Sequence, residues 1–226
     1  MSSRTCKNFL TSIALCLFFA AIIVPLRASA KDLDGIGADL SSEDWRVRLA
    51  AVEKLENRKD DGALSLLMQV AGARNEYWPV KVKAILFLGE TRDPRAVDIL
   101  LSTFNDTFWN WECPSIKSYT AIALGNFKGN PKVVDALLNG VSDRELLTRE
   151  ASIQSLGRIG DTRAVQDLVG LLGDRSAAIR LSAIKALEGI GDSRAIPHLE
   201  RIAQNDSEAV VKAEASAALS SLNGRK

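Results

Sequence analysis

One short pattern recurs six times and limits the fold more than any other feature of the sequence. Each copy has a β-branched residue followed by a basic one, small or apolar residues four and five positions later, and leucine eight positions later. Apolar residues at this spacing form one stripe along an α-helix. The copies begin 33, 36, 32, 31 and 32 residues apart, at Val47, Val80, Ile116, Thr148, Ile179 and Val211.

A second apolar stripe follows each copy after a tight turn. Glycine stands at the end of the first helix, as at Gly160 and Gly191, where a left-handed backbone costs glycine little. A capping residue for the second helix comes next, at Asp60, Asp93, Asn130, Asp161 and Asp192. We call the first helix of each unit the A helix and the second the B helix.

One such helix pair cannot bury its apolar faces alone, so neighbouring pairs must stack. We therefore predict an all-α fold, a right-handed α-solenoid of antiparallel helix pairs over 43–226. It contains five pairs and a terminal A helix, and residues 31–42 form a lead-in or cap.

The first 30 residues read as an export signal. Arg4 and Lys7 precede an apolar run over 13–26, and Ala28-Ser29-Ala30 supplies the small residues of a cleavage site. Cleavage after Ala30 predicts an exported protein, periplasmic or extracellular, with no membrane contact afterwards. The alternative is an inner-membrane anchor formed by an uncleaved 9–26, although the run is shorter than the ~20 residues of a typical span.

Charge and residue counts exclude several classes of function. Removing the three basic residues of the signal from 29 leaves 26 basic against 28 acidic residues, a balance without the basic excess of a nucleic-acid-binding protein. Cys113 is then the single cysteine, so no intrachain disulfide can form. One histidine, His198, does not make a metal site. We predict no catalytic residue, no cofactor and no metal.

The repeat Val-Arg-x-x-Ala-x-x-x-Leu-Gly-x-x-Gly-Asp-x-Arg-Ala-Val-x-x-Leu resembles the HEAT repeat, in the short form found in phycobilisome lyases, over 43–222. The resemblance implies a curved solenoid used mostly for protein binding. Two enzyme groups share the repeat. Deoxyhypusine hydroxylases carry His-Glu pairs on their helices, which this sequence lacks, and bilin lyases leave open an alternative function as a lyase-like or cofactor-handling enzyme subunit.

Aromatic residues distinguish the N-terminal half from a plain repeat. Trp45 and Trp78 both stand two residues before the repeated pair, and Tyr77 precedes Trp78. The longest junction between repeats holds Phe108, Trp109 and Trp111. Because aromatic side chains are enriched at binding hot spots, we predict a partner-binding stripe along this edge. The alternative is that these rings pack over the ends of neighbouring helices.

The B helices supply the second predicted contact surface. We expect them to line the concave side, where outward positions are apolar early, as at Leu66 and Ile99, and polar late, as at Glu200. An apolar groove with a polar rim suits a peptide or a helix. The alternative is that such residues, for example Leu101 and Leu138, pack against adjacent B helices.

The repeated basic residues predict a ladder of ion pairs with the repeated aspartates between neighbouring repeats, each exposed pair contributing well under about 1 kcal/mol. Taken together, the sequence predicts an exported, monomeric, non-catalytic scaffold that binds an unidentified protein partner in the cell envelope.

Overall fold

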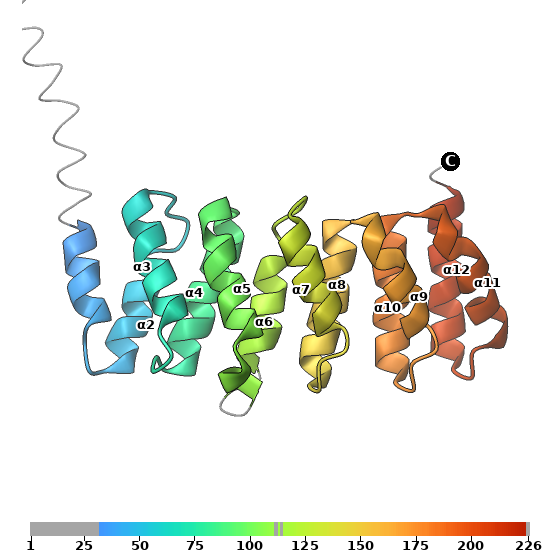
Figure 1. Cartoon of the computed structure of the whole chain (residues 1–226), viewed down its shortest axis with the longest axis horizontal. Coiled ribbons are helices and arrows are strands. Elements are labelled where there is room, and N and C mark those ends of the chain that lie inside the picture. Colours follow the sequence, from blue (N-terminus) through green and yellow to red (C-terminus); the bar gives the residue numbers. More distant parts are fainter. Residues whose placement is uncertain (1–31, 111–112, 114, 225–226) are drawn as a thin grey trace, which may run out of the picture.

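The structure is a computed structural model that describes residues 32–110, 113 and 115–224. The predicted signal 1–30 and Trp111 lie outside the described residues. All regular structure in the described part is helical, and Figure 1 shows helix pairs stacked side by side along one axis. The predicted all-α solenoid is therefore confirmed.

The helices alternate between two rows. The A row consists of α2 (Trp45–Glu53), α4 (Trp78–Thr91), α6 (Ser115–Leu124), α8 (Leu146–Ile159), α10 (Ala177–Ile190) and α12 (Ala209–Asn223). The B row consists of α3 (Asp61–Gly72), α5 (Val97–Asn105), α7 (Pro131–Gly140), α9 (Val165–Leu171) and α11 (Ile196–Asn205). Short 3-10 turns are η1 (Pro94–Ala96), η2 (Thr107–Asn110), η3 (Thr162–Ala164) and η4 (Ser193–Ala195).

The lead-in is itself helical over 32–40. Leu33 lies against Gly62 of α3, and Leu66 of α3 lies against Gly37, so this helix packs on the first B helix. Ile36 is buried in that contact. The segment therefore takes the place of a preceding B helix and covers the end of the core.

Capping follows the sequence prediction closely. Each of the five predicted Asp or Asn residues accepts a hydrogen bond from a backbone N–H two or three residues later, at Asp60, Asp93, Asn130, Asp161 and Asp192. Gly160 and Gly191 end α8 and α10 with φ of 79° and 80°. Arg92 ends α4 in the same left-handed region, at φ 54°, without being glycine.

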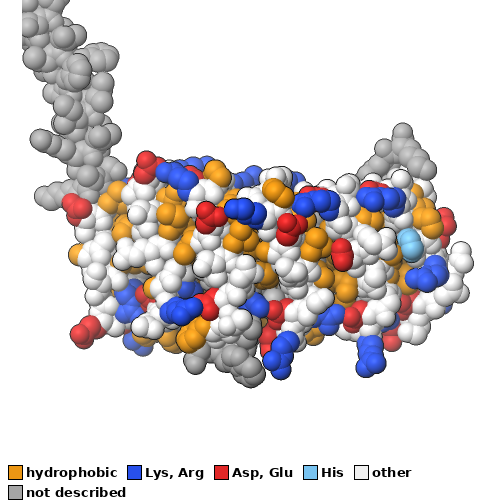
Figure 2. Space-filling view, viewed as in Figure 1, with side chains coloured by type: hydrophobic (Ala, Val, Ile, Leu, Met, Phe, Trp, Pro, Cys, Tyr) orange, Lys and Arg blue, Asp and Glu red, His pale blue; other side chains and the backbone are white. Residues whose placement is uncertain are grey.

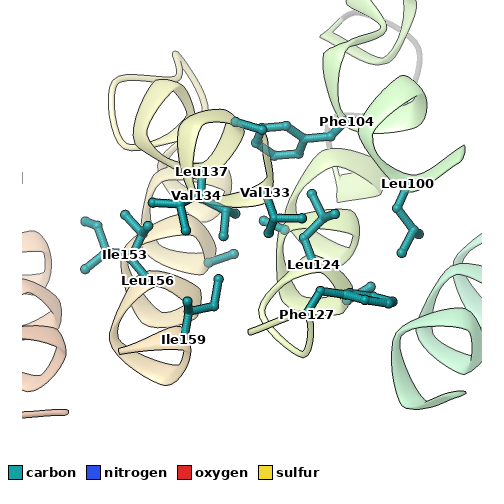
Figure 3. Close-up of a cluster of buried hydrophobic side chains, with 14 of the residues drawn as sticks. Leu100, Phe104, Leu124, Phe127, Val133, Val134, Leu137, Ile153, Leu156 and Ile159 are labelled. Carbon is teal, nitrogen blue, oxygen red and sulfur yellow. The ribbon is translucent and has the colours of Figure 1, made fainter. Parts of the chain in front are cut away.

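A continuous hydrophobic core fills the space between the rows (Figure 3). In its central part, side chains of α5, α6, α7, α8 and the turn after α6 meet. They are Leu100, Phe104, Leu124, Phe127, Val133, Val134, Leu137, Ile153, Leu156 and Ile159, all at most 7% exposed. No repeat has a core of its own, as the stacking argument requires.

Glycines set the spacing within the A row. A Cβ on Gly89 would lie 2.7 Å from Ala123 Cα, and one on Gly157 would lie 2.6 Å from Ala186 Cα. Gly125 faces Ser155 in the same way, and Ser155 Oγ donates to the Ala121 carbonyl at 2.8 Å. The backbones of α4, α6, α8 and α10 therefore approach more closely than side chains would allow.

This spacing corrects the predicted curvature. Neighbouring A helices contact each other along more of their length than neighbouring B helices do. A stack bends towards its more closely spaced row, so the A row, not the B row, lines the inner side. The prediction that the B helices form the concave surface is wrong because the recurring glycines bring neighbouring A helices into backbone contact in addition to ending helices.

A ladder of ion pairs is present at four of the five repeat junctions in the described chain. The predicted aspartates take part in three of them, Lys117–Asp143, Arg149–Asp174 and Arg180–Asp206, and a glutamate takes that place in Arg48–Glu76. Its pairs are more buried than predicted: the side chains of Arg180 and Asp206 are 9% and 5% exposed. Asp206 also accepts from the Glu208 N–H at 2.9 Å. The Asp206 carboxylate therefore stabilises the turn before α12 and also links this turn to α10.

Candidate partner-binding surface

The A row carries an open groove between α4, α6 and α8. Its volume is about 420 Å³, and we call it the A-row groove. Aromatic and aliphatic side chains dominate its lining, and small or polar residues complete it: Trp78, Ser115, Ser118, Tyr119, Ile122, Leu147, Glu150, Ala151 and Gln154. Ser118 and Ala151 are buried, whereas the other lining residues lie on the open faces of the A helices, so the groove opens on the inner side of the solenoid.

Exposed apolar side chains at the starts of the A helices extend this surface. Trp78 is 46% exposed and Leu147 is 63% exposed, the latter in the first turn of α8. The Tyr77 ring centroid lies 6.4 Å from that of Trp78 and 4.8 Å from that of Trp45. The structure therefore brings three of the predicted contact residues, Trp45, Tyr77 and Trp78, into one aromatic cluster that adjoins the groove.

Trp109 does not join that surface. It is 4% exposed and packs into the core, so the prediction that it forms part of an exposed edge is wrong. Phe108 meets it edge-on at 4.8 Å and is 38% exposed, with the Arg74 guanidinium 5.9 Å from its ring centroid. Among the described residues of the insertion before α6, Trp109 therefore packs into the core, while Phe108 is the aromatic residue exposed to solvent.

The ring of Trp109 covers a buried cation. Lys81 Nζ lies 4.8 Å from the Trp109 ring centroid and donates to the carbonyls of Ala71 and Ala73. Lys81 is 1% exposed, and burial lowers its pKa to about 8, which the nearby charge of Asp106 only partly offsets. The C-terminal end of α3 and one aromatic ring thus surround an ammonium group that forms no ion pair within the described residues.

The predicted B-row residues pack against the core and do not line the A-row groove. Leu66 and Ile99 are half-buried against the core, and Ile99 Cδ1 lies close to Gly72 of α3. In the view of Figure 2, hydrophobic side chains are scattered along the middle of the visible face and charged groups gather towards both long edges. The surroundings of Leu66 and Ile99 match the packing alternative stated for Leu101 and Leu138, which are also half-buried.

A second cleft, of about 520 Å³, lies at the turns of the second and third repeats. At other turns an arginine ties its own Asp cap to the preceding repeat, as Arg163 does with Asp161 and Asp135. The equivalent residue here is Lys132, which forms no salt bridge in the described chain. Three lysine or arginine residues and one aspartate line this cleft, and its larger apolar side chains, Val97 and Phe127, are buried.

The described part of the chain was also compared with the requirements of a metal site, a reactive thiol and a membrane-spanning helix. No group of three or more His, Cys, Asp or Glu residues there could hold a metal ion. Cys113 is a free, half-buried thiol 3.7 Å from Ser115 Oγ. No described helix is long and apolar enough to cross a membrane.

Three residues of the groove, Tyr119, Ile122 and Leu147, were not predicted from the sequence as contact residues. A signal for them existed: the third and sixth positions after the repeated β-branched residue carry Tyr119 and Ile122 in the third repeat, but Ser182 and Lys185 in the fifth. These positions could be assigned to the inner face only once the A row was known to lie on the inner side. That follows from the glycine contacts between A helices, which only the three-dimensional structure shows.

Comparison with known proteins places the chain in a family. Three overlapping stretches, 33–112, 110–177 and 149–220, match the family of HEAT repeats, so the chain belongs to the HEAT-repeat family. No curated protein matches the chain.

Solved structures show the same fold. The CpcE–CpcF complex of phycocyanin lyase from Nostoc matches with a TM-score of 0.60 and 25% identity, over 75% of this chain and 68% of that chain. A designed armadillo repeat protein in complex with the peptide (KR)4 matches with a TM-score of 0.60 and 19% identity, over 84% and 99%. An engineered protein matches with a TM-score of 0.56 and 17% identity, over 85% and 97%.

Proposed function

We propose that this chain is a non-catalytic scaffold that binds a protein partner through the A-row groove and the adjoining aromatic cluster of Trp45, Tyr77 and Trp78. One observation carries the proposal: an open groove on the inner face of the solenoid is lined by Trp78, Tyr119, Ile122 and Leu147. Exposed aromatic and aliphatic side chains that converge on a groove are the usual anchors of a protein interface. HEAT and armadillo repeats typically bind proteins, which supports this use of the groove.

A matched pair of substitutions tests the groove. Leu147 and Val210 both directly precede the repeated β-branched residue, on α8 and α12, and both are exposed, at 63% and 58%. Only Leu147 lines the groove. The full chain, Leu147→Asp and Val210→Asp would each be used for affinity capture from an envelope extract of the source organism, with mass-spectrometric quantification. We expect Leu147→Asp alone to lose the captured partner; equal capture by all three would refute the groove as the binding site.

We also propose that the partner is met outside the cytoplasm, because the predicted signal at 1–30 would export the chain. Fusion of these residues to a reporter enzyme active only after export, with a fusion lacking them as control, tests this. A reporter that stays inactive with 1–30 attached would refute export.

A second candidate function is that of a lyase-like or cofactor-handling enzyme subunit. It is favoured by the similarity to the CpcE–CpcF phycocyanin lyase, at 25% identity. Titration of the chain with a free bilin, followed by visible absorbance, distinguishes the two. A saturable spectral shift that Leu147→Asp abolishes would favour the enzyme subunit over the scaffold.

A further inference from the structure

We propose that the A-row groove takes a lysine or arginine side chain of the partner, paired with the Glu150 carboxylate and in contact with the rings of Trp78 and Tyr119. The inference rests on the proposed function, since it names the kind of residue that enters the same groove. Among the described residues that line the groove, Glu150 is the only charged one.

Glu150 has no salt-bridge or hydrogen-bond partner in the described part of the chain, and cations on the three groove-forming helices are engaged elsewhere. Lys83 of α4 lies 4.0 Å from Glu53, and Lys117 of α6 pairs with Asp143. Arg158, two turns further along α8 than Glu150, donates to the Ile122 carbonyl at 3.3 Å. The carboxylate is therefore left for a group from outside the chain.

The two aromatic rings of the groove, Trp78 and Tyr119, likewise have no charged partner within the described chain. Five other rings each have a lysine or arginine of this chain within 6 Å of the centroid: Trp45, Phe87, Phe104, Phe108 and Trp109. Trp78 and Tyr119 have none among the described residues. A cation over the face of an aromatic ring is stabilised by the ring quadrupole, and Trp is the strongest such ring.

The free-energy cost of desolvating the Glu150 carboxylate favours a cationic partner group over a neutral one. A partner that covers the groove with apolar side chains alone would remove water from Glu150 and leave its charge unpaired, which is costly. An acidic side chain would add repulsion. A lysine or arginine whose aliphatic stem lies along Ile122 and Leu147 satisfies the carboxylate and the rings together.

The test uses a random peptide library selected on the full chain, followed by fluorescence anisotropy with selected peptides. We expect enrichment of Lys or Arg next to aliphatic residues. Replacing the enriched Arg by citrulline, or Lys by norleucine, should weaken binding by about tenfold, which corresponds to ~1.4 kcal/mol. Glu150→Gln should weaken the cationic peptide similarly and leave the neutral peptide unchanged.

Glu145→Gln is the matched control, because Glu145 is an exposed carboxylate at the start of the same helix that does not line the groove. It should leave all affinities unchanged. Selected peptides without cations, or equal binding of the cationic peptide by wild type and Glu150→Gln, would overturn this inference. The proposed function would survive that outcome if Leu147→Asp still abolished peptide binding, and would fall if it did not.

Discussion

Replacement of Gly157 by alanine tests whether glycine contacts hold the A row together. The added Cβ would lie 2.6 Å from Ala186 Cα and 2.9 Å from its Cβ, whereas ordinary contacts begin near 3.4 Å. The opposing atoms include backbone, which cannot rotate away as a side-chain tip can. Overpacking of this kind costs about 1–3 kcal/mol.

Helix propensity acts in the opposite direction and needs its own control. Alanine is favoured over glycine within a helix by about 1 kcal/mol. Gly170 provides the control, since it lies in α9 and a Cβ there would meet nothing within 4 Å. Gly170→Ala should therefore be neutral or stabilising, and the difference between the two variants isolates the close contact from the propensity.

Urea unfolding followed by circular dichroism measures that difference. We expect Gly157→Ala to be less stable than Gly170→Ala by about 1–3 kcal/mol, a shift of roughly 2–4 °C in melting temperature per kcal/mol for a chain of this size. Equal stability of the two variants would refute the conclusion that backbone contact at Gly157 sets the spacing, and with it the assignment of the A row to the inner side.

Three further predictions concern the junction of the second and third repeats and the ion-pair ladder. Trp109→Ala should cost about 3–5 kcal/mol of unfolding free energy because the ring is buried, while Phe108→Ala should stay within about 0.5 kcal/mol; similar losses for both would contradict the burial difference. Because burial lowers the pKa of Lys81 to about 8, the folded state binds fewer protons than the unfolded state above that pH, so unfolding free energy should rise from pH 8 towards 10.5 and fall as pH drops through 8. Lys81→Met should remove that rise in urea titrations at both pH values, and an unchanged rise would assign it to another group. Arg180→Met should destabilise more than Arg46→Met in thermal melts, because Arg180 is nearly buried against Asp206 whereas Arg46 is 72% exposed; equal melting temperatures would show that the ladder contributes nothing.

The repeat unit itself was predictable because its determinants are local. Caps such as Asp161 and helix ends such as Gly160 act within a few residues, and the apolar stripe has a period that a helix fixes. The groove was not predictable in this way. Its members Trp78, Tyr119 and Leu147 come from three helices, and which face they share depends on the curvature set by Gly89, Gly125 and Gly157.

The junction before α6 shows how a repeat can change its chemistry without changing its fold. Asp106 follows Lys81 by 25 residues, the spacing at which Asp174 follows Arg149 and pairs with it. Here Asp106 instead accepts from Arg74 and from the Phe108 N–H, and Trp109 covers the ammonium that the carboxylate would have paired with. An aromatic ring and two carbonyls replace an ion pair as neighbours of the lysine. Burial without a paired carboxylate lowers the pKa of Lys81 to about 8, so this junction makes the stability of the solenoid depend on pH in the alkaline range, whereas the lowered pKa values of Asp174 and Asp206 act in the acidic range.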